Sequence, residues 1–143
     1  MLSGEFQVRV YWGHCDPAKI VYYPNYFTWI DHAGHELLEK GGLDQLGLRK
    51  RYGLRGTVLG NVSAEFKTPA FFGDIIDVYS EVGKIGRATF EISHEVKRGD
   101  TLLAKAKELR VWVIDDETSP SGIRSAPIPD AVRAVLEGRA AAY

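Results

Sequence analysis

Hydrophobic and polar residues alternate along much of the second half of the chain, which predicts β-strands at residues 58–67, 74–82 and 87–97. The alternation is strict in the third segment, where one face would carry Ala88, Phe90, Ile92, His94 and Val96. A turn at Gly99-Asp100 leads into a long strand at residues 101–114. Short glycine-containing turns between successive strands favour an antiparallel sheet.

The first half of the chain follows a different period. Residues 6–12 alternate and predict a first strand, whereas apolar residues in 24–40 recur at helical spacing. Pro24 suits the first turn of this helix, and Gly41-Gly42 would end it. Gly34, in the middle of the helix, costs up to ~1 kcal/mol relative to alanine. We therefore expect a sheet or a partner to approach the helix backbone closely at this position.

These elements predict an α+β fold, with one curved antiparallel sheet of about five strands packed against a long central helix. A short helical turn is expected at residues 43–52 and a C-terminal helix at 127–139, while residues 115–125 are rich in turn formers. The chain has 143 residues and no linker or internal repeat, so we expect a single domain spanning 1–143. The pattern alone does not fix the topology of the sheet.

Composition and charge exclude several classes of function. The net charge is −1, with 18 basic and 19 acidic residues, so no overall field would recruit nucleic acid or an anionic membrane. Cys15 is the single cysteine, which excludes an intrachain disulfide and a zinc site made only of thiolates. Residues 1–5 lack the pattern of a signal peptide, and no apolar run approaches the roughly 20 residues of a membrane span. We expect a cytoplasmic protein.

The most informative segment runs from Asp16 to Tyr26 and has the sequence D-P-A-K-I-V-Y-Y-P-N-Y. This segment resembles the 4-hydroxybenzoyl-CoA thioesterase family, and in particular the branch that acts on aryl-CoA thioesters. The resemblance implies a hotdog fold and hydrolysis of an acyl-CoA, with 4-hydroxybenzoyl-CoA or a close aryl-CoA as the leading substrate. It further implies a homotetramer built from two hotdog dimers, with active sites between subunits and no cofactor beyond the CoA of the substrate.

Two residues of this segment are the candidate catalytic groups. Asp16 follows the first predicted strand and precedes a helix whose first N–H groups lack internal partners, and such groups stabilise an oxyanion. Ionised Asp16 can attack the acyl carbon or activate water as a general base. The resemblance assigns the oxyanion donor to the backbone N–H of Tyr23. The alternative for Asp16 is a purely structural role as the cap of a turn before Pro17.

Three further residues are candidates for binding the substrate. The resemblance places Asp31 against the acyl ring, where its carboxylate could accept a hydrogen bond from a para-hydroxyl; the alternative is an ordinary surface aspartate. Arg87 resembles the basic position that meets the CoA phosphates, with Lys84 as a weaker companion, although exposed basic residues beside a turn are usually only solvated. In the Tol–Pal-associated branch a histidine usually replaces Tyr23 and often a glycine replaces Lys19, which argues here against a histidine-assisted mechanism.

The remaining histidines and Cys15 are weaker candidates for a functional role. His32 and His35 are three residues apart but lack a third metal ligand at a recognisable spacing, and no base is evident for Cys15 as a nucleophile. His94 lies on the apolar face of its strand and is expected to be a hydrogen-bonded core or interface residue. Two rival functions remain open: a thioesterase for aliphatic acyl-CoA or acyl-carrier-protein substrates, and a hotdog module that binds CoA without hydrolysing its thioester.

Overall fold

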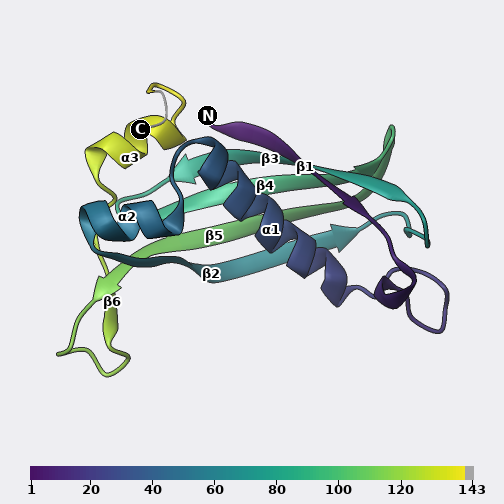
Figure 1. Cartoon of the computed structure of the whole chain (residues 1–143), viewed down its shortest axis with the longest axis horizontal. Coiled ribbons are helices and arrows are strands. Elements are labelled where there is room, and N and C mark those ends of the chain that lie inside the picture. The colour runs from purple at the N-terminus through teal and green to yellow at the C-terminus, as the bar shows by residue number, and fades with distance from the viewer. Residues whose placement is uncertain (141–143) are drawn as a thin grey trace.

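A long helix, α1 (Pro24–Lys40), lies across one face of a curved antiparallel sheet in the computed structural model of the chain (Figure 1). The structure describes residues 1–140. The remaining elements, in chain order, are β1 (Ser3–Arg9), η1 (Trp12–His14), α2 (Gln45–Tyr52), β2 (Leu54–Phe66), β3 (Ile75–Ile85), β4 (Thr89–Arg98), β5 (Thr101–Asp115), β6 (Ile123–Ser125) and α3 (Asp130–Leu136). The bounds of α1 are those predicted from the sequence, and the α+β class with a C-terminal helix is confirmed.

The sheet has the strand order β1-β3-β4-β5-β2, so β1 and β2 are its two edges. The consecutive strands β3, β4 and β5 pair as hairpins, as the glycine turns predict. Strand β2 returns to pair with β5 along its whole length. The sheet curves around α1, which is the hotdog arrangement, and the two faces of the sheet alternate in burial along β3 and β4.

The core lies between α1 and the concave face of the sheet. Apolar side chains of α1, among them Trp29, Ile30 and Leu37, are at most 4% exposed. A Cβ atom on Gly34 would lie 3.0 Å from Glu108 Oε2 and 3.6 Å from Ile92 Cδ1. The expected close approach of the sheet at Gly34 is therefore confirmed, and the nearest atom belongs to a carboxylate.

The structure departs from the sequence predictions at the ends of the sheet. The first strand is Ser3–Arg9 rather than 6–12, because the N–H of Val10 bonds to the carbonyl of Asp74 and the chain then turns through η1. The turn-rich segment 115–125 contains the short strand β6, which pairs with residues 113–115 of β5. No helix in the described part of the chain is long and apolar enough to cross a membrane.

Candidate functional site

A tight loop carries Asp16 to the start of α1. Cys15 and Val21 form an isolated antiparallel bridge, and the N–H of Asp16 donates to the carbonyl of Ile20 at 3.0 Å. The N–H of Tyr22 donates to the carbonyl of His14 at 2.8 Å. These bonds close residues 16–20 into a loop whose two ends lie side by side, so that Asp16 lies next to the chain segment that enters the helix.

The Asp16 side chain uses one oxygen to cap this loop and leaves the other free. Its Oδ1 accepts a hydrogen bond from the N–H of Ala18 at 2.8 Å, and the residue is partly buried. Within residues 1–140, Oδ2 has no hydrogen-bond or ion-pair partner. Asp16 therefore caps the turn through Oδ1, and Oδ2 remains available to act as a nucleophile or a general base.

Lys19 closes the loop in the left-handed region of backbone space, with φ 65°. This conformation is rare for residues other than glycine and costs of order 1–2 kcal/mol. Its N–H donates to the carbonyl of Asp16 at 2.8 Å, which stabilises the turn. The hydrogen bond that closes the turn is made by the backbone of Lys19, and the side chain of Lys19 is exposed.

The first turn of α1 leaves one backbone donor without a partner. The N–H of Asn25 bonds to the carbonyl of Tyr22, that of Tyr26 bonds to the carbonyl of Tyr23, and Pro24 has no N–H. Among the described residues, the N–H of Tyr23 has no acceptor. Tyr23 is the N-cap of the helix, with helical φ −54° and ψ −33°, so this free donor lies at the positive end of the helix dipole.

Aromatic side chains surround the start of α1. The ring of Phe66, at the end of β2, lies 5.3 Å from that of Tyr26, 6.3 Å from Phe27 and 6.4 Å from Tyr23, measured between centroids. Phe66 is 48% exposed and Tyr23 is 58% exposed. The free N–H of Tyr23 therefore lies beside an open apolar surface, which can bind an aromatic or aliphatic acyl group.

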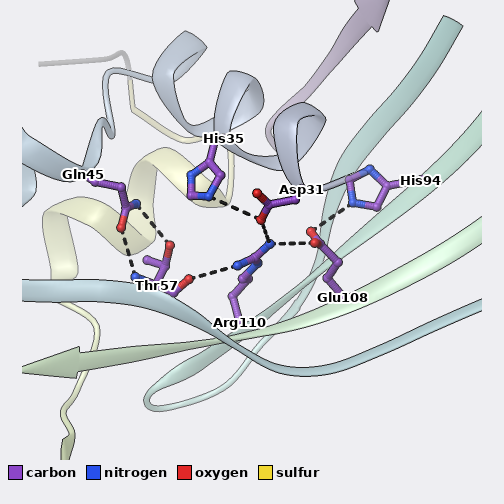
Figure 2. Close-up of polar contacts among 7 residues, drawn as sticks. All are labelled: Asp31, His35, Gln45, Thr57, His94, Glu108 and Arg110. Carbon is purple, nitrogen blue, oxygen red and sulfur yellow. Dashed lines mark hydrogen bonds and ion pairs between the residues drawn. The ribbon is translucent and has the colours of Figure 1, made fainter. Parts of the chain in front are cut away.

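Asp31 belongs to a polar network inside the fold (Figure 2). Its Oδ1 accepts a hydrogen bond from Arg110 Nη2 at 2.8 Å and lies 3.5 Å from Nε2 of His35, one helical turn further on. The Asp31 side chain remains 48% exposed. Asp31 is thus not an isolated surface aspartate, because its position is coupled to a side chain of the sheet.

The rest of this network is buried. Arg110 Nη2 also donates to Glu108 Oε1 at 2.6 Å, and Glu108 Oε2 lies 3.1 Å from Nε2 of His94. His94 Nδ1 lies 2.7 Å from Oγ of Ser80. His94 is therefore the hydrogen-bonded core residue expected from the sequence. Burial opposes the charge on Arg110, but Glu108 and Asp31 outweigh that effect and raise the pKa of Arg110 above its ordinary value.

Glu108 and Arg110 were not predicted as site residues from the sequence, although the pattern of their strand contained a signal. Both occupy the same face of β5 as Ala104, Ala106 and Trp112, and this face is buried. Two charged residues on an otherwise apolar strand face must find partners inside the protein. Gly34 in α1 was a second signal. Because glycine has no side chain, it leaves the space that the Glu108 carboxylate fills.

Arg87 and Lys84 lie at the end of the sheet opposite Asp16. Strand β1 leads into the Asp16 loop and pairs its last residue, Arg9, with Ile75 at the start of β3. Lys84 and Arg87 lie at and beyond the far end of β3, so roughly 30 Å of strand separates the two groups. Figure 1 shows η1 and the β3–β4 turn at opposite ends of the molecule. Within a single chain, Asp16 and Tyr23 therefore lie at the same end of the sheet, and Arg87 and Lys84 lie at the other end.

Two hollows open on the surface of the single chain. One is lined by residues of β1, β3 and β4 and by Lys40 of α1, and the other by residues of β2, β4 and β5. Neither is lined by Asp16, Tyr23 or Asp31. Tyr23 instead lies beside Phe66, the last residue of edge strand β2.

Comparison with known proteins shows the family to which the chain belongs. Residues 10–136 match the thioesterase-like superfamily. The chain belongs to this superfamily. It is 33% identical over 118 residues to a 4-hydroxybenzoyl-CoA thioesterase from Pseudomonas sp. (strain CBS-3), covering 77% of this chain and 82% of the relative. A putative esterase from Aquifex aeolicus (strain VF5) is 33% identical over 101 residues, covering 71% of this chain and 77% of the relative.

Solved structures of the same superfamily share the fold. A crystal structure of an Asp→Asn mutant of 4-hydroxybenzoyl-CoA thioesterase, complexed with 4-hydroxybenzoyl-CoA, superposes with a TM-score of 0.86 at 29% identity, covering 95% of this chain and 99% of that one. The BH1999 gentisyl-coenzyme A thioesterase superposes with a TM-score of 0.78 at 27% identity, covering 94% and 99%. The hotdog fold expected from the sequence is confirmed.

Proposed function

We propose that this thioester hydrolase cleaves an aryl-CoA thioester to a free carboxylate and CoA, with 4-hydroxybenzoyl-CoA as its preferred substrate. Asp16 acts as nucleophile or general base, and the N–H of Tyr23 is the oxyanion donor. The observation that carries the proposal is that one continuous segment leading into α1 holds a carboxylate oxygen of Asp16 and the backbone N–H of Tyr23, neither of which has a partner among residues 1–140. The reaction so formulated consumes only water and the thioester.

The two routes differ in what attacks the acyl carbon. In the first, an Asp16 oxygen attacks, the carbonyl π electrons move to oxygen, and collapse expels CoA thiolate to leave a mixed anhydride that water hydrolyses. In the second, Asp16 accepts a proton from the attacking water, and the same tetrahedral intermediate expels the thiolate. In both routes the negative charge develops on the carbonyl oxygen. A donor such as the Tyr23 N–H binds that oxygen more strongly in the transition state than in the ground state.

The spacing along α1 favours a hydroxylated ring as the acyl group. Asp31 follows Tyr23 by eight residues, which is about 12 Å along a helix. For an acyl group lying along the helix axis, hydrogen bonds of ~3 Å at each end leave roughly 6 Å between a carbonyl oxygen bound to Tyr23 and a hydroxyl bound to Asp31. This gap suits a benzene ring substituted on opposite carbons. The Pseudomonas relative is named for 4-hydroxybenzoyl-CoA, and BH1999 for the hydroxylated aryl thioester gentisyl-CoA.

Asp31→Asn tests this choice of acyl group. Asparagine keeps an acceptor for Arg110 but loses the charge that strengthens a hydrogen bond to a phenolic hydroxyl. We expect the preference for 4-hydroxybenzoyl-CoA over benzoyl-CoA, measured as a ratio of kcat/KM values, to fall roughly tenfold or more. Unchanged selectivity would remove Asp31 from the acyl site.

A second copy of the chain would complete the site. Edge strand β2 exposes the apolar residues Val58, Leu59 and Phe66 by 37%, 47% and 48%. Antiparallel pairing of β2 with its copy across a twofold axis would place opposite ends of two protomers together. The Asp16 end of one chain would then approach the Arg87 end of the other. We propose a hotdog dimer of this kind, paired into a homotetramer, in which Arg87 and Lys84 bind the CoA phosphates.

Arg87→Ala tests the phosphate site. Loss of a charge-assisted contact to phosphate should raise KM for the CoA thioester severalfold with little change in kcat, because the contact is equally strong before and during reaction. Lys84→Ala should give a smaller effect of the same kind. Arg124→Ala, which removes an exposed arginine from β6, is the matched control and should leave KM unchanged. An unaltered KM in Arg87→Ala would place the CoA phosphates elsewhere.

A panel of CoA thioesters separates the proposal from its two rivals. Purified protein is assayed for release of free thiol from 4-hydroxybenzoyl-, benzoyl- and hexanoyl-CoA. We expect the highest kcat/KM for the hydroxylated ring. A higher value for the hexanoyl thioester would indicate an aliphatic thioesterase, and release of thiol from none of them would indicate a module that binds CoA without hydrolysis.

A further inference from the structure

The buried part of the Asp31 network has no part in the chemistry described above. The side chains of His94, Glu108 and Arg110 are 0%, 2% and 8% exposed, whereas that of Asp31 is 48% exposed. The network thus joins three buried side chains to the half-exposed carboxylate of Asp31 (Figure 2). A buried ion pair contributes little to stability when compared with apolar residues of the same shape. We therefore expect the ion pair to act by fixing the positions of the side chains that it joins.

Three hydrogen bonds hold the guanidinium of Arg110 in place. Its Nη2 donates to Glu108 Oε1 at 2.6 Å and to Asp31 Oδ1 at 2.8 Å, while Nη1 lies 3.3 Å from the carbonyl oxygen of Thr57. One nitrogen therefore serves both carboxylates. Only Oδ1 of Asp31 is engaged in this way, and within residues 1–140 its Oδ2 has no partner.

We propose that Glu108 is a specificity-determining positioning residue for the acyl group. By binding Arg110 from the sheet side, Glu108 keeps the guanidinium in contact with Asp31 Oδ1 and leaves Oδ2 available to a hydroxyl donor on the substrate. Without the charge of Glu108, Arg110 would face a single carboxylate, and a guanidinium and a carboxylate favour a bidentate pair. Both oxygens of Asp31 would then be occupied. This inference rests on the role proposed above for Asp31.

Glu108→Gln keeps the size of the side chain and an acceptor for Arg110 but removes the charge. We expect kcat/KM for 4-hydroxybenzoyl-CoA to fall roughly tenfold, because a hydrogen bond to a charged group is lost, while kcat/KM for benzoyl-CoA stays within about twofold of wild type. Glu95→Gln is the matched control, since Glu95 follows His94 on β4 but points to the opposite face of the sheet and pairs with Lys97. It should change neither value.

The double variant Asp31→Asn with Glu108→Gln separates positioning from a general structural role. If Glu108 acts through Asp31, the double variant should discriminate between the two substrates no worse than Asp31→Asn alone. Equal losses on both substrates, or losses that multiply in the double variant, would overturn the inference. Should Glu108→Gln yield too little folded protein, Glu108→Asp applies the same test, since aspartate keeps the charge but is one methylene shorter and so draws the carboxylate away from Arg110. A loss confined to the hydroxylated substrate supports the inference, and any other result overturns it.

The outcomes also distinguish this inference from the proposed function. A wild-type protein that releases thiol from no CoA thioester would overturn the proposed function itself. A wild-type protein that prefers the hydroxylated ring and loses that preference in Asp31→Asn, but keeps it in Glu108→Gln, would leave the proposed function intact. That result would overturn only the role of Glu108.

Discussion

Replacing Asp16 with asparagine is expected to abolish thioester hydrolysis while leaving the fold unchanged. Asparagine can still accept the 2.8 Å hydrogen bond from the N–H of Ala18, so the loop before α1 keeps its cap. It cannot act as a carboxylate nucleophile or accept a proton from water at neutral pH. A positioned acid–base group contributes 10²–10⁴-fold, so kcat with 4-hydroxybenzoyl-CoA should fall at least about 100-fold.

The chain contains a closely matched control for this substitution. Asp116 caps another turn in the same way, with its Oδ1 accepting from the N–H of Thr118 at 2.9 Å, in the loop between β5 and β6. Asp116→Asn should leave kcat and KM unchanged. Circular dichroism and thermal unfolding would verify that both variants fold. If Asp16→Asn retained more than about a tenth of wild-type kcat/KM, the carboxylate would have no direct part in the reaction.

The sequence predicted the elements that depend on local pattern. The helix 24–40 was recognisable from its apolar spacing and from Pro24 and Gly41-Gly42 at its ends, and the structure has the same bounds. The strands β3 to β5 were recognisable because one face of each is buried, which produces the alternation. Strand β6 was missed because its three residues are too few to show a period, and it exists through pairing with the end of β5.

The functional site was predictable only in the part that is local in sequence. Asp16 and Tyr23 lie in one continuous segment, so a single motif contains both. The pairing of Asp31 with Arg110 joins residues 79 positions apart, and it depends on how β5 packs against α1, which no local pattern encodes. The separation of Arg87 from Asp16 follows from the pairing of β1 with β3 and from the length of β3.

Removing the guanidinium of Arg110 is expected to give the largest loss of stability among the substitutions considered. Arg110→Met keeps a flexible apolar side chain of similar length, but it leaves Glu108 buried without a cation and Asp31 without its donor. Breaking a buried ion pair by removing one partner costs about 3–5 kcal/mol. The raised pKa of Arg110 is consistent with this expectation, since the two carboxylates favour its charged form despite burial. Urea unfolding followed by tryptophan fluorescence would measure the loss.

Arg55→Met provides the contrasting case. Arg55 also donates to a carboxylate, that of Asp115 at 3.1 Å, but the two side chains are 56% and 53% exposed. An exposed ion pair of this kind contributes about 0.2–1 kcal/mol because water screens both charges. Replacing Glu108 by glutamine in the Arg110→Met background should recover part of the lost stability, because the uncompensated charge is then removed. A loss in Arg110→Met no greater than that in Arg55→Met would mean that the buried carboxylate of Glu108 does not depend on Arg110 for its stabilisation. In that case Glu108 would not hold Arg110 by charge, and the free oxygen of Asp31 would need another explanation.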